Sequence, residues 1–135
     1  MKRAYKILTK LHKKPGIYII SCTETDKVYI GESLNVSGRI LKHFTNLRNK
    51  KHHNTILQNI FNKYGEESMV VGILEWVNLE DPIQLDFLLR KKEIEYQKKF
   101  KYCINFDKNG YAWKLNATEE QKEANRKQLD SIRDK

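Results

Sequence analysis

The sequence predicts an α+β domain, an α/β sandwich-like arrangement in which a small, mainly antiparallel three-stranded sheet is flanked by helices. Ile, Val and Tyr, which fit a pleated surface, are concentrated in two short segments near the N-terminus, and one later run is almost continuously apolar. Three other stretches place apolar residues at helical spacing. The elements are expected at residues 16–22, 27–31, 36–49, 54–64, 69–76 and 82–101. The order strand, strand, helix, helix, strand, helix favours a small sheet covered by helices.

The two N-terminal strands are predicted to pair as a β-hairpin. Pro15 breaks any preceding helix, and residues 23–26 provide a short polar connection typical of a hairpin. The first strand begins with Gly16-Ile17-Tyr18, and the second ends with Tyr29-Ile30-Gly31. The hairpin therefore carries two tyrosines on neighbouring strands.

Caps and apolar spacing define the later elements. Asn35 and the Asp81-Pro82 pair are typical helix starts, and Gly65 is typical of a helix end. The apolar run 69–76 is predicted to be a buried strand. On the first helix the apolar face comprises Ile40, Leu41, Phe44 and Leu47. On the last helix it comprises Leu85, Leu89, Tyr96 and Phe100, widened by Phe87 and Leu88.

Size and charge limit the classes of protein to consider. The 135 residues fit one domain with a real core. Lys and Arg outnumber Asp and Glu by 26 to 17, and the formal net charge of +9 favours a polyanionic partner. No stretch approaches ~18 continuous apolar residues, so no membrane span is expected. Cys22 and Cys103 lack metal-ligand spacing and are expected to be reduced thiols, which indicates an intracellular setting, cytoplasmic or host-cell cytoplasm if viral.

Charge and apolar content divide the chain into three parts. Residues 1–14 hold six basic side chains and no acidic one. They are expected to form a basic arm or short helix, which either packs an apolar stripe on the domain or contacts phosphates. Residues 15–106 form the predicted main domain. Residues 107–135 are a polar extension, predicted to be helical or disordered.

Glu93 is the most informative single position. It lies four residues after Leu89 and seven before Phe100, which places its carboxylate on the core-facing stripe of the last helix. A lone ionised carboxylate on that stripe is costly. The side chain is therefore expected either to form a buried pair with Lys or Arg, or to be presented to a divalent ion.

Arg39 and His43 are four residues apart and share one face of the first helix. An arginine held there provides the two-pronged donor that a phosphodiester requires. The alternative is a pair of unrelated surface residues. Gly38, just before Arg39, weakens the helix by roughly 1 kcal/mol against Ala, which a need to leave room for another backbone or a ligand would explain.

The two tripeptides and the residues after them resemble the GIY-YIG nuclease family. Its name-giving motifs stand unaltered at residues 16–18 and 29–31. Members then carry an Arg on the first helix, a Glu on a later helix and an Asn shortly after that helix, and Arg39, Glu93 and Asn105 occupy these positions. The segments His43-Phe44, His52, Leu57-Gln58 and 61–65 are similar to the phage homing-endonuclease branch. The resemblance covers residues 15–106.

The resemblance implies a role for each matching residue in a metal-dependent DNA endonuclease, homing-endonuclease-like. Glu93 would hold one divalent ion, Mg²⁺ (or Mn²⁺), against the scissile phosphate, and Arg39 would stabilise the charge on that phosphate. Tyr18 would activate or orient the attacking water, with its pKa lowered by cations or its proton taken by His43. Tyr29 would position water or phosphate, and Asn105 would brace the site by hydrogen bonds.

Basic residues beside these positions are the candidate DNA contacts. Residues 39–63 contain six Lys or Arg and no acid, which is typical of a surface that binds the nucleic-acid backbone. The candidate contacts are Arg39, Lys42, Arg48, Lys50, Lys51 and His52, of which His52 is alternatively a catalytic residue.

Two further functions share the same sequence features. One is a structure-selective DNA repair nuclease, although the Lys that excision-repair members carry soon after the second tripeptide is missing from residues 32–35. The other is a module that binds nucleic acid on the same fold without cleaving it.

Overall fold

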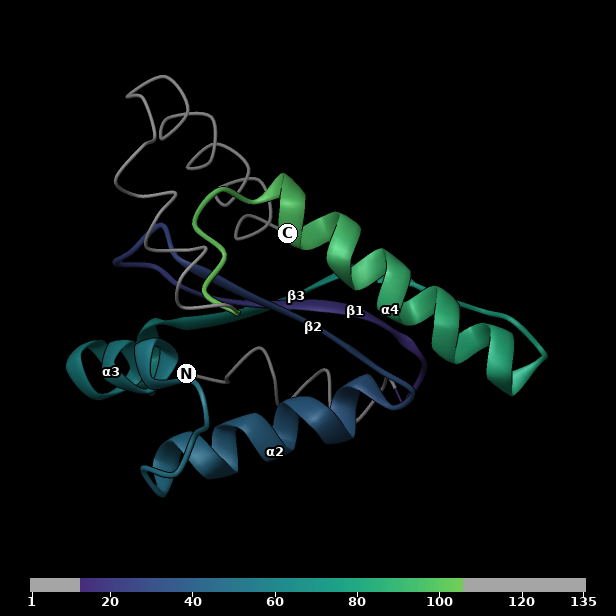
Figure 1. Cartoon of the computed structure of the whole chain (residues 1–135). Coiled ribbons are helices and arrows are strands. Elements are labelled where there is room, and N and C mark those ends of the chain that lie inside the picture. The colour runs from purple at the N-terminus through teal and green to yellow at the C-terminus, as the bar shows by residue number, and fades with distance from the viewer. Residues whose placement is uncertain (1–12, 106–135) are drawn as a thin grey trace.

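The computed structural model describes residues 13–105, which form a three-stranded sheet and the helices packed on it (Figure 1). The elements in chain order are β1 (Gly16–Cys22), β2 (Val28–Ser33), α2 (Val36–Arg48), α3 (Thr55–Tyr64), the 3-10 turn η1 (Glu66–Ser68), β3 (Met69–Trp76) and α4 (Pro82–Lys99). The predicted α+β class and the predicted order of elements are confirmed. The predictions for residues 1–12 and 107–135 lie outside the described residues and stay predictions.

The sheet is antiparallel throughout, with the order β2-β1-β3. In the β1–β2 ladder Tyr18 is paired with Gly31, and Ile20 with Tyr29. Helices α2 and α3 lie on one side of the sheet, and α4 crosses the other side (Figure 1). The last residues of the two tripeptides, Tyr18 and Gly31, therefore meet across the β1–β2 ladder of a three-layer structure.

Strand alternation explains why the domain has two apolar cores. Tyr18, Ile20 and Cys22 face α2 and α3, where they pack with Ile40, Phe44, Leu47 and Leu57. Ile17 and Ile19 face the opposite side, where they pack with Leu85, Leu89 and Phe100 of α4. Successive strand side chains point to opposite faces, so a hairpin buried on both sides requires a continuous run of apolar residues.

The helices begin at side-chain caps, of which the sequence predicts those at Asn35 and Asp81. The side chains of Asn35 and Asn54 accept hydrogen bonds from the amides of Gly38 and Leu57, and Asp81 accepts from Ile83 and Gln84. Each cap satisfies amides that the first helical turn leaves unpaired. Gly65 ends α3 with a φ of 82°, which a side chain disfavours.

Three details of the predicted core are wrong. Strand β3 is only partly buried, with Met69 its one buried residue. The other edge strand, β2, is buried because residues 102–105 pair with its outer edge. Phe87 is 71% exposed and Leu41 is 48% exposed, because each lies off the narrow face that its helix turns to the sheet.

Within residues 13–105, no helix combines the length and apolar character needed to cross a membrane.

Candidate active site

Tyr18 is placed by the contact between β1 and β2. Its side chain is only 2% exposed, and a Cβ added to Gly31 would overlap its hydroxyl group. Gly16 is similarly constrained, since a Cβ there would lie 2.7 Å from the Glu75 carbonyl oxygen. Both glycines of the tripeptides are therefore required by close packing, and Gly31 specifically makes room for the phenol of Tyr18.

A chain of short hydrogen bonds connects Tyr18 to two buried histidines. The Tyr18 hydroxyl lies 2.6 Å from Nε2 of His43, which α2 turns toward the sheet. Nδ1 of His43 lies 2.7 Å from Nε2 of His52, in the loop between α2 and α3. Burial, followed by the neighbouring His52, lowers the pKa of His43 to about 3. Burial and the neighbouring His53 lower that of His52 to about 4.

Tyr29 lies beside the same histidines but makes weaker polar contacts. Its ring meets the edge of His43 at a centroid distance of 5.1 Å, and its hydroxyl is 3.4 Å from Nε2 of the exposed His53. Burial and then the charge of Glu93 raise the pKa of Tyr29 to about 12. Burial also raises the pKa of Tyr18 well above its usual value, with Tyr29 adding to the effect. Both phenols are thus neutral in the protein alone, contrary to the lowered pKa expected for Tyr18.

Glu93 lies half-buried on α4, without an ion-pair partner among residues 13–105. Burial raises the pKa of its carboxyl group, and the nearby carboxylate of Glu32 raises it further. Hydrogen bonds from the Glu32 backbone amide and from Gln97 oppose this shift. The adjacent Lys92 is engaged elsewhere, 2.7 Å from Glu75. The alternative of a buried pair with Lys or Arg is therefore not what the structure shows.

Arg39 is exposed in the first turns of α2. Its positive charge interacts with the side chains of Tyr18, Tyr29 and Glu93. Its guanidinium opposes the rise in the pKa of Tyr18, Tyr29 and Glu93. Tyr18, Tyr29, Arg39 and Glu93 thus share one electrostatic environment. The space at Gly38 is filled by the Asn35 cap, since a Cβ there would lie 2.8 Å from the Asn35 amide nitrogen. The expected room for a ligand at Gly38 is absent.

Asn105 makes hydrogen bonds along the outer edge of β2. Its Oδ1 accepts a hydrogen bond from the Ile30 amide at 2.8 Å, and its Nδ2 donates to the Ile30 carbonyl. The Cys103 thiol donates to the same Oδ1, and burial raises the pKa of that thiol to about 11. Asn105 thus satisfies both backbone groups that an edge strand would leave unpaired at Ile30.

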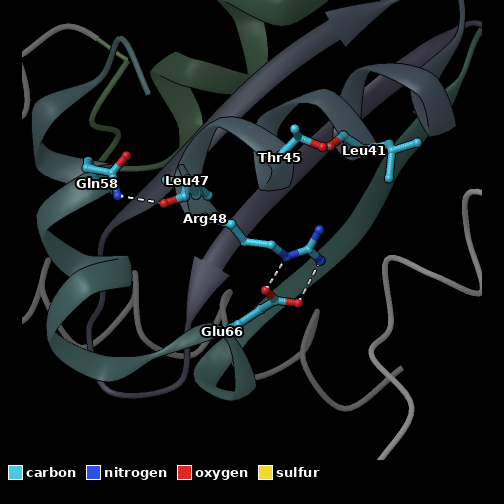
Figure 2. Close-up of polar contacts among 6 residues, drawn as sticks. All are labelled: Leu41, Thr45, Leu47, Arg48, Gln58 and Glu66. Carbon is cyan, nitrogen blue, oxygen red and sulfur yellow. Dashed lines mark hydrogen bonds and ion pairs between the residues drawn. The ribbon is translucent and has the colours of Figure 1, made fainter. Parts of the chain in front are cut away.

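The predicted DNA contacts divide into exposed and engaged side chains. Lys42, Lys50 and Lys51 are exposed. Arg48 instead forms a two-pronged ion pair with Glu66, at 2.6 and 2.9 Å (Figure 2). His52 is 7% exposed and does not lie on the surface, because its backbone amide is held by Gln58 and its ring by His43.

A single divalent ion fits the donors at this site. No group of three or more His, Cys, Asp or Glu side chains that could hold a metal occurs among residues 13–105. Mg²⁺, however, retains several waters and is commonly bound by one or two carboxylates together with substrate phosphates. The unpaired carboxylate of Glu93, with Glu32 nearby, meets that requirement.

Several residues of the site were missed by the sequence reasoning. Glu32, His53, Asn54 and Gln97 all contact candidate catalytic residues. Glu32 was noted only as part of a segment without Lys, and Asn54 only as a helix start. The signal for Asn54 was its place two residues after His52, within reach of that ring.

Comparison with known families identifies the class of protein to which this fold and this group of residues belong. The model of the GIY-YIG catalytic domain matches residues 14–109. The chain belongs to the GIY-YIG family, which confirms the resemblance found in its sequence.

The chain is similar to an intron-encoded endonuclease and to the catalytic domain of a homing endonuclease. The chain is similar to a probable intron-encoded endonuclease 1 of Neurospora crassa, with 34% identity over 130 residues. The matched part covers 93% of this chain but 40% of that protein. Among solved structures it is similar to the catalytic domain of the homing endonuclease I-TevI, at 32% identity and a TM-score of 0.58 over 73% of this chain and 96% of that one. A mutant of the same catalytic domain matches at 31% identity and a TM-score of 0.57, over 72% of this chain and 90% of that one.

Proposed function

We propose that the chain is a metal-dependent DNA endonuclease of the homing type that hydrolyses phosphodiester bonds. The observation that carries the proposal is the half-buried carboxylate of Glu93, which has no ion-pair partner among the described residues and shares its electrostatic environment with two phenols and Arg39. A structural glutamate on this face would be neutralised by a neighbouring lysine. Glu93 instead remains available to a cation that the substrate brings with it.

The divalent ion, Mg²⁺ or Mn²⁺, would be held by Glu93 together with the scissile phosphate. When bound, it would polarise the phosphoryl oxygens and stabilise the leaving oxygen. The protein would supply the remaining groups. Arg39, exposed on α2, would donate two hydrogen bonds to the phosphate and stabilise the charge that builds on it.

Tyr18 would orient the attacking water as a neutral phenol. Its raised pKa argues against a free phenolate before substrate and metal arrive. A side chain at position 31 would overlap the Tyr18 hydroxyl, so Gly31 is what permits the phenol to lie there. Tyr29 would position water or phosphate from the neighbouring strand, and Asn105 would keep β2 in place through Ile30.

The proposal is tested by nicking of supercoiled plasmid in Mg²⁺, with and without EDTA, for the wild type and Glu93→Gln. The substitution keeps the shape of the side chain and removes its charge, so nicking should be abolished while DNA binding is largely retained. Glu95→Gln is the matched control, because Glu95 is exposed two positions along α4. Unchanged nicking by Glu93→Gln would exclude the assigned role.

The same assay separates the other two functions. A module that only binds DNA would shift the plasmid in a gel but produce no nick in Mg²⁺ or Mn²⁺. A structure-selective nuclease would cut branched DNA and spare linear duplexes. We expect cleavage of duplex DNA, with product ends that map to a preferred site when a mixed panel of DNA is digested and sequenced.

A further inference from the structure

His43 and His52 form a buried, uncharged pair between Tyr18 and the loop after α2. Their side chains are 5% and 7% exposed. No carboxylate forms an ion pair with either ring among the described residues. Each ring therefore carries a single proton near neutral pH. A neutral imidazole donates a hydrogen bond from one nitrogen and accepts at the other, so each proton has a definite position.

The Asn54 backbone amide determines which ring nitrogen of His52 carries the proton. The Asn54 amide donates a hydrogen bond to Nδ1 of His52 at 3.0 Å. A backbone amide can only donate, so this ring nitrogen must be the acceptor. The proton of His52 is thereby assigned to Nε2, the atom that faces His43.

The position of the proton on His52 in turn determines the position of the proton on His43. The two imidazoles meet Nε2 to Nδ1 at 2.7 Å, so His52 donates and Nδ1 of His43 accepts. The proton of His43 is consequently on Nε2, which lies 2.6 Å from the Tyr18 oxygen. In this arrangement His43 donates to Tyr18 and has no free lone pair on that side to take a proton.

We propose that His52 and His43 are positioning residues that form a directed hydrogen-bond relay, which starts at the Asn54 amide and ends with an N–H donated to the Tyr18 oxygen. The relay leaves the hydroxyl hydrogen of Tyr18 free to be donated to substrate or water. The role in cleavage rests on the proposed function. The relay gives His43 a donor role in place of the base role that the sequence suggested.

Hydrogen bonds hold the loop that carries His52 in the conformation that the relay requires. The Gln58 side chain accepts from the His52 amide at 3.1 Å and donates to the Leu47 carbonyl at 3.0 Å, and the second of these bonds is drawn in Figure 2. The Asn54 side chain caps α3 and also donates to the Ile104 carbonyl at 2.6 Å. One residue thus anchors the relay and the segment that ends in Asn105.

Long-range ¹H–¹⁵N NMR of the histidine rings in the full chain at pH 7 tests the direction without any need for activity. We expect both rings to be neutral with the proton on Nε2, and the signals to be assigned by their loss in His43→Gln and His52→Gln. A proton on Nδ1 of His43, or a His43 ring that titrates near pH 6.5, would overturn the relay. If the tautomers are as expected but the protein does not cut DNA, the proposed function is wrong. The hydrogen-bond assignment would still be correct.

Cleavage rates then separate a donor from a base. Gln at position 43 can donate an N–H to Tyr18 but cannot take a proton in catalysis. We expect His43→Gln to lose about tenfold, on the scale of one imperfect hydrogen bond, and His43→Ala to lose about 10²-fold, as a displaced reacting group does. The pH profile of His43→Gln should keep the shape of the wild-type profile. Equal losses of about 10²- to 10⁴-fold in both variants would identify a general base instead.

Discussion

Tyr18 and Gly31 face each other across the β1–β2 ladder, and the tyrosine hydroxyl occupies the space that a side chain at Gly31 would need. The two tripeptides are therefore one structural unit. The glycine of the second permits the buried position of the tyrosine of the first, in which that tyrosine reaches His43.

Gly31→Ala should displace the Tyr18 ring and break its hydrogen bond to His43. Such overpacking costs about 1–3 kcal/mol, which urea unfolding would measure, and cleavage should fall by about 10²-fold because a reacting group is misplaced. Gly72→Ala is the control, because Gly72 lies on β3, on the other side of β1 from Gly31. A Gly31→Ala variant with wild-type cleavage would show that the close contact has no function.

Arg39→Ala should reduce the rate of cleavage by about 10²-fold or more, the scale of removing a donor to the transition state. Arg90→Ala is the matched control, since Arg90 is exposed on α4 and 3.4 Å from Asp86. Single-turnover rates at saturating protein separate this loss from weaker binding. A rate within twofold of the wild type would reduce Arg39 to a backbone contact.

Replacing Lys50 and Lys51 together by Ala should weaken the salt dependence of DNA binding. Each lost phosphate contact lowers the slope of log K against log salt by about 1, so a change of about 2 is expected in fluorescence anisotropy. Arg48→Ala should leave the slope unchanged, because Glu66 already holds that guanidinium. The reverse pattern would place the DNA over the Arg48–Glu66 pair.

Stability should fall as the pH is lowered from about 7 to 4. The folded-state pKa values of His43 and His52, about 3 and about 4, lie below the unfolded value of about 6.5. The unfolded chain therefore binds more protons in this window, and the free energy of unfolding decreases as the pH falls. Above about pH 7 this contribution is constant.

Urea unfolding midpoints at pH 7 and pH 4.5 measure this loss. The wild type is compared with the double variant His43→Gln/His52→Gln. Carboxylates contribute to the acid sensitivity of both proteins, so the difference between them reports the two histidines. The wild type should lose more stability than the double variant between the two pH values. Equal losses would mean that the two rings titrate normally.

The hairpin, the caps at Asn35 and Asp81 and the order of elements follow from sequence because local chemistry determines them. The continuous apolar run in 16–22 and the capping residues Asn35 and Asp81 act within a few positions of themselves. The partial burial of β3 depends on which edge of the sheet residues 102–105 cover, which no local pattern reveals.

The candidate site was predicted less completely than the fold. The spacing of Glu93 from Leu89 and Phe100 indicated a carboxylate on the buried side of α4, and the structure bears this out in part, at half-burial. The relay was missed because it needs the loop after α2 to bring His52 against His43 on the preceding helix. The pairing of Arg48 with Glu66 likewise joins residues 18 positions apart, so a basic segment alone could not show which of its charges are free.

Paramagnetic line broadening by Mn²⁺ in ¹H–¹⁵N NMR spectra of the chain bound to a non-cleavable DNA tests the central claim most directly. The account predicts that broadening at low Mn²⁺ is centred on the amides of Gly31, Glu32 and Glu93, and that it disappears in Glu93→Gln. Broadening centred on another acidic region, such as Glu66 and Glu67, or retained in Glu93→Gln, would contradict a metal held by Glu93.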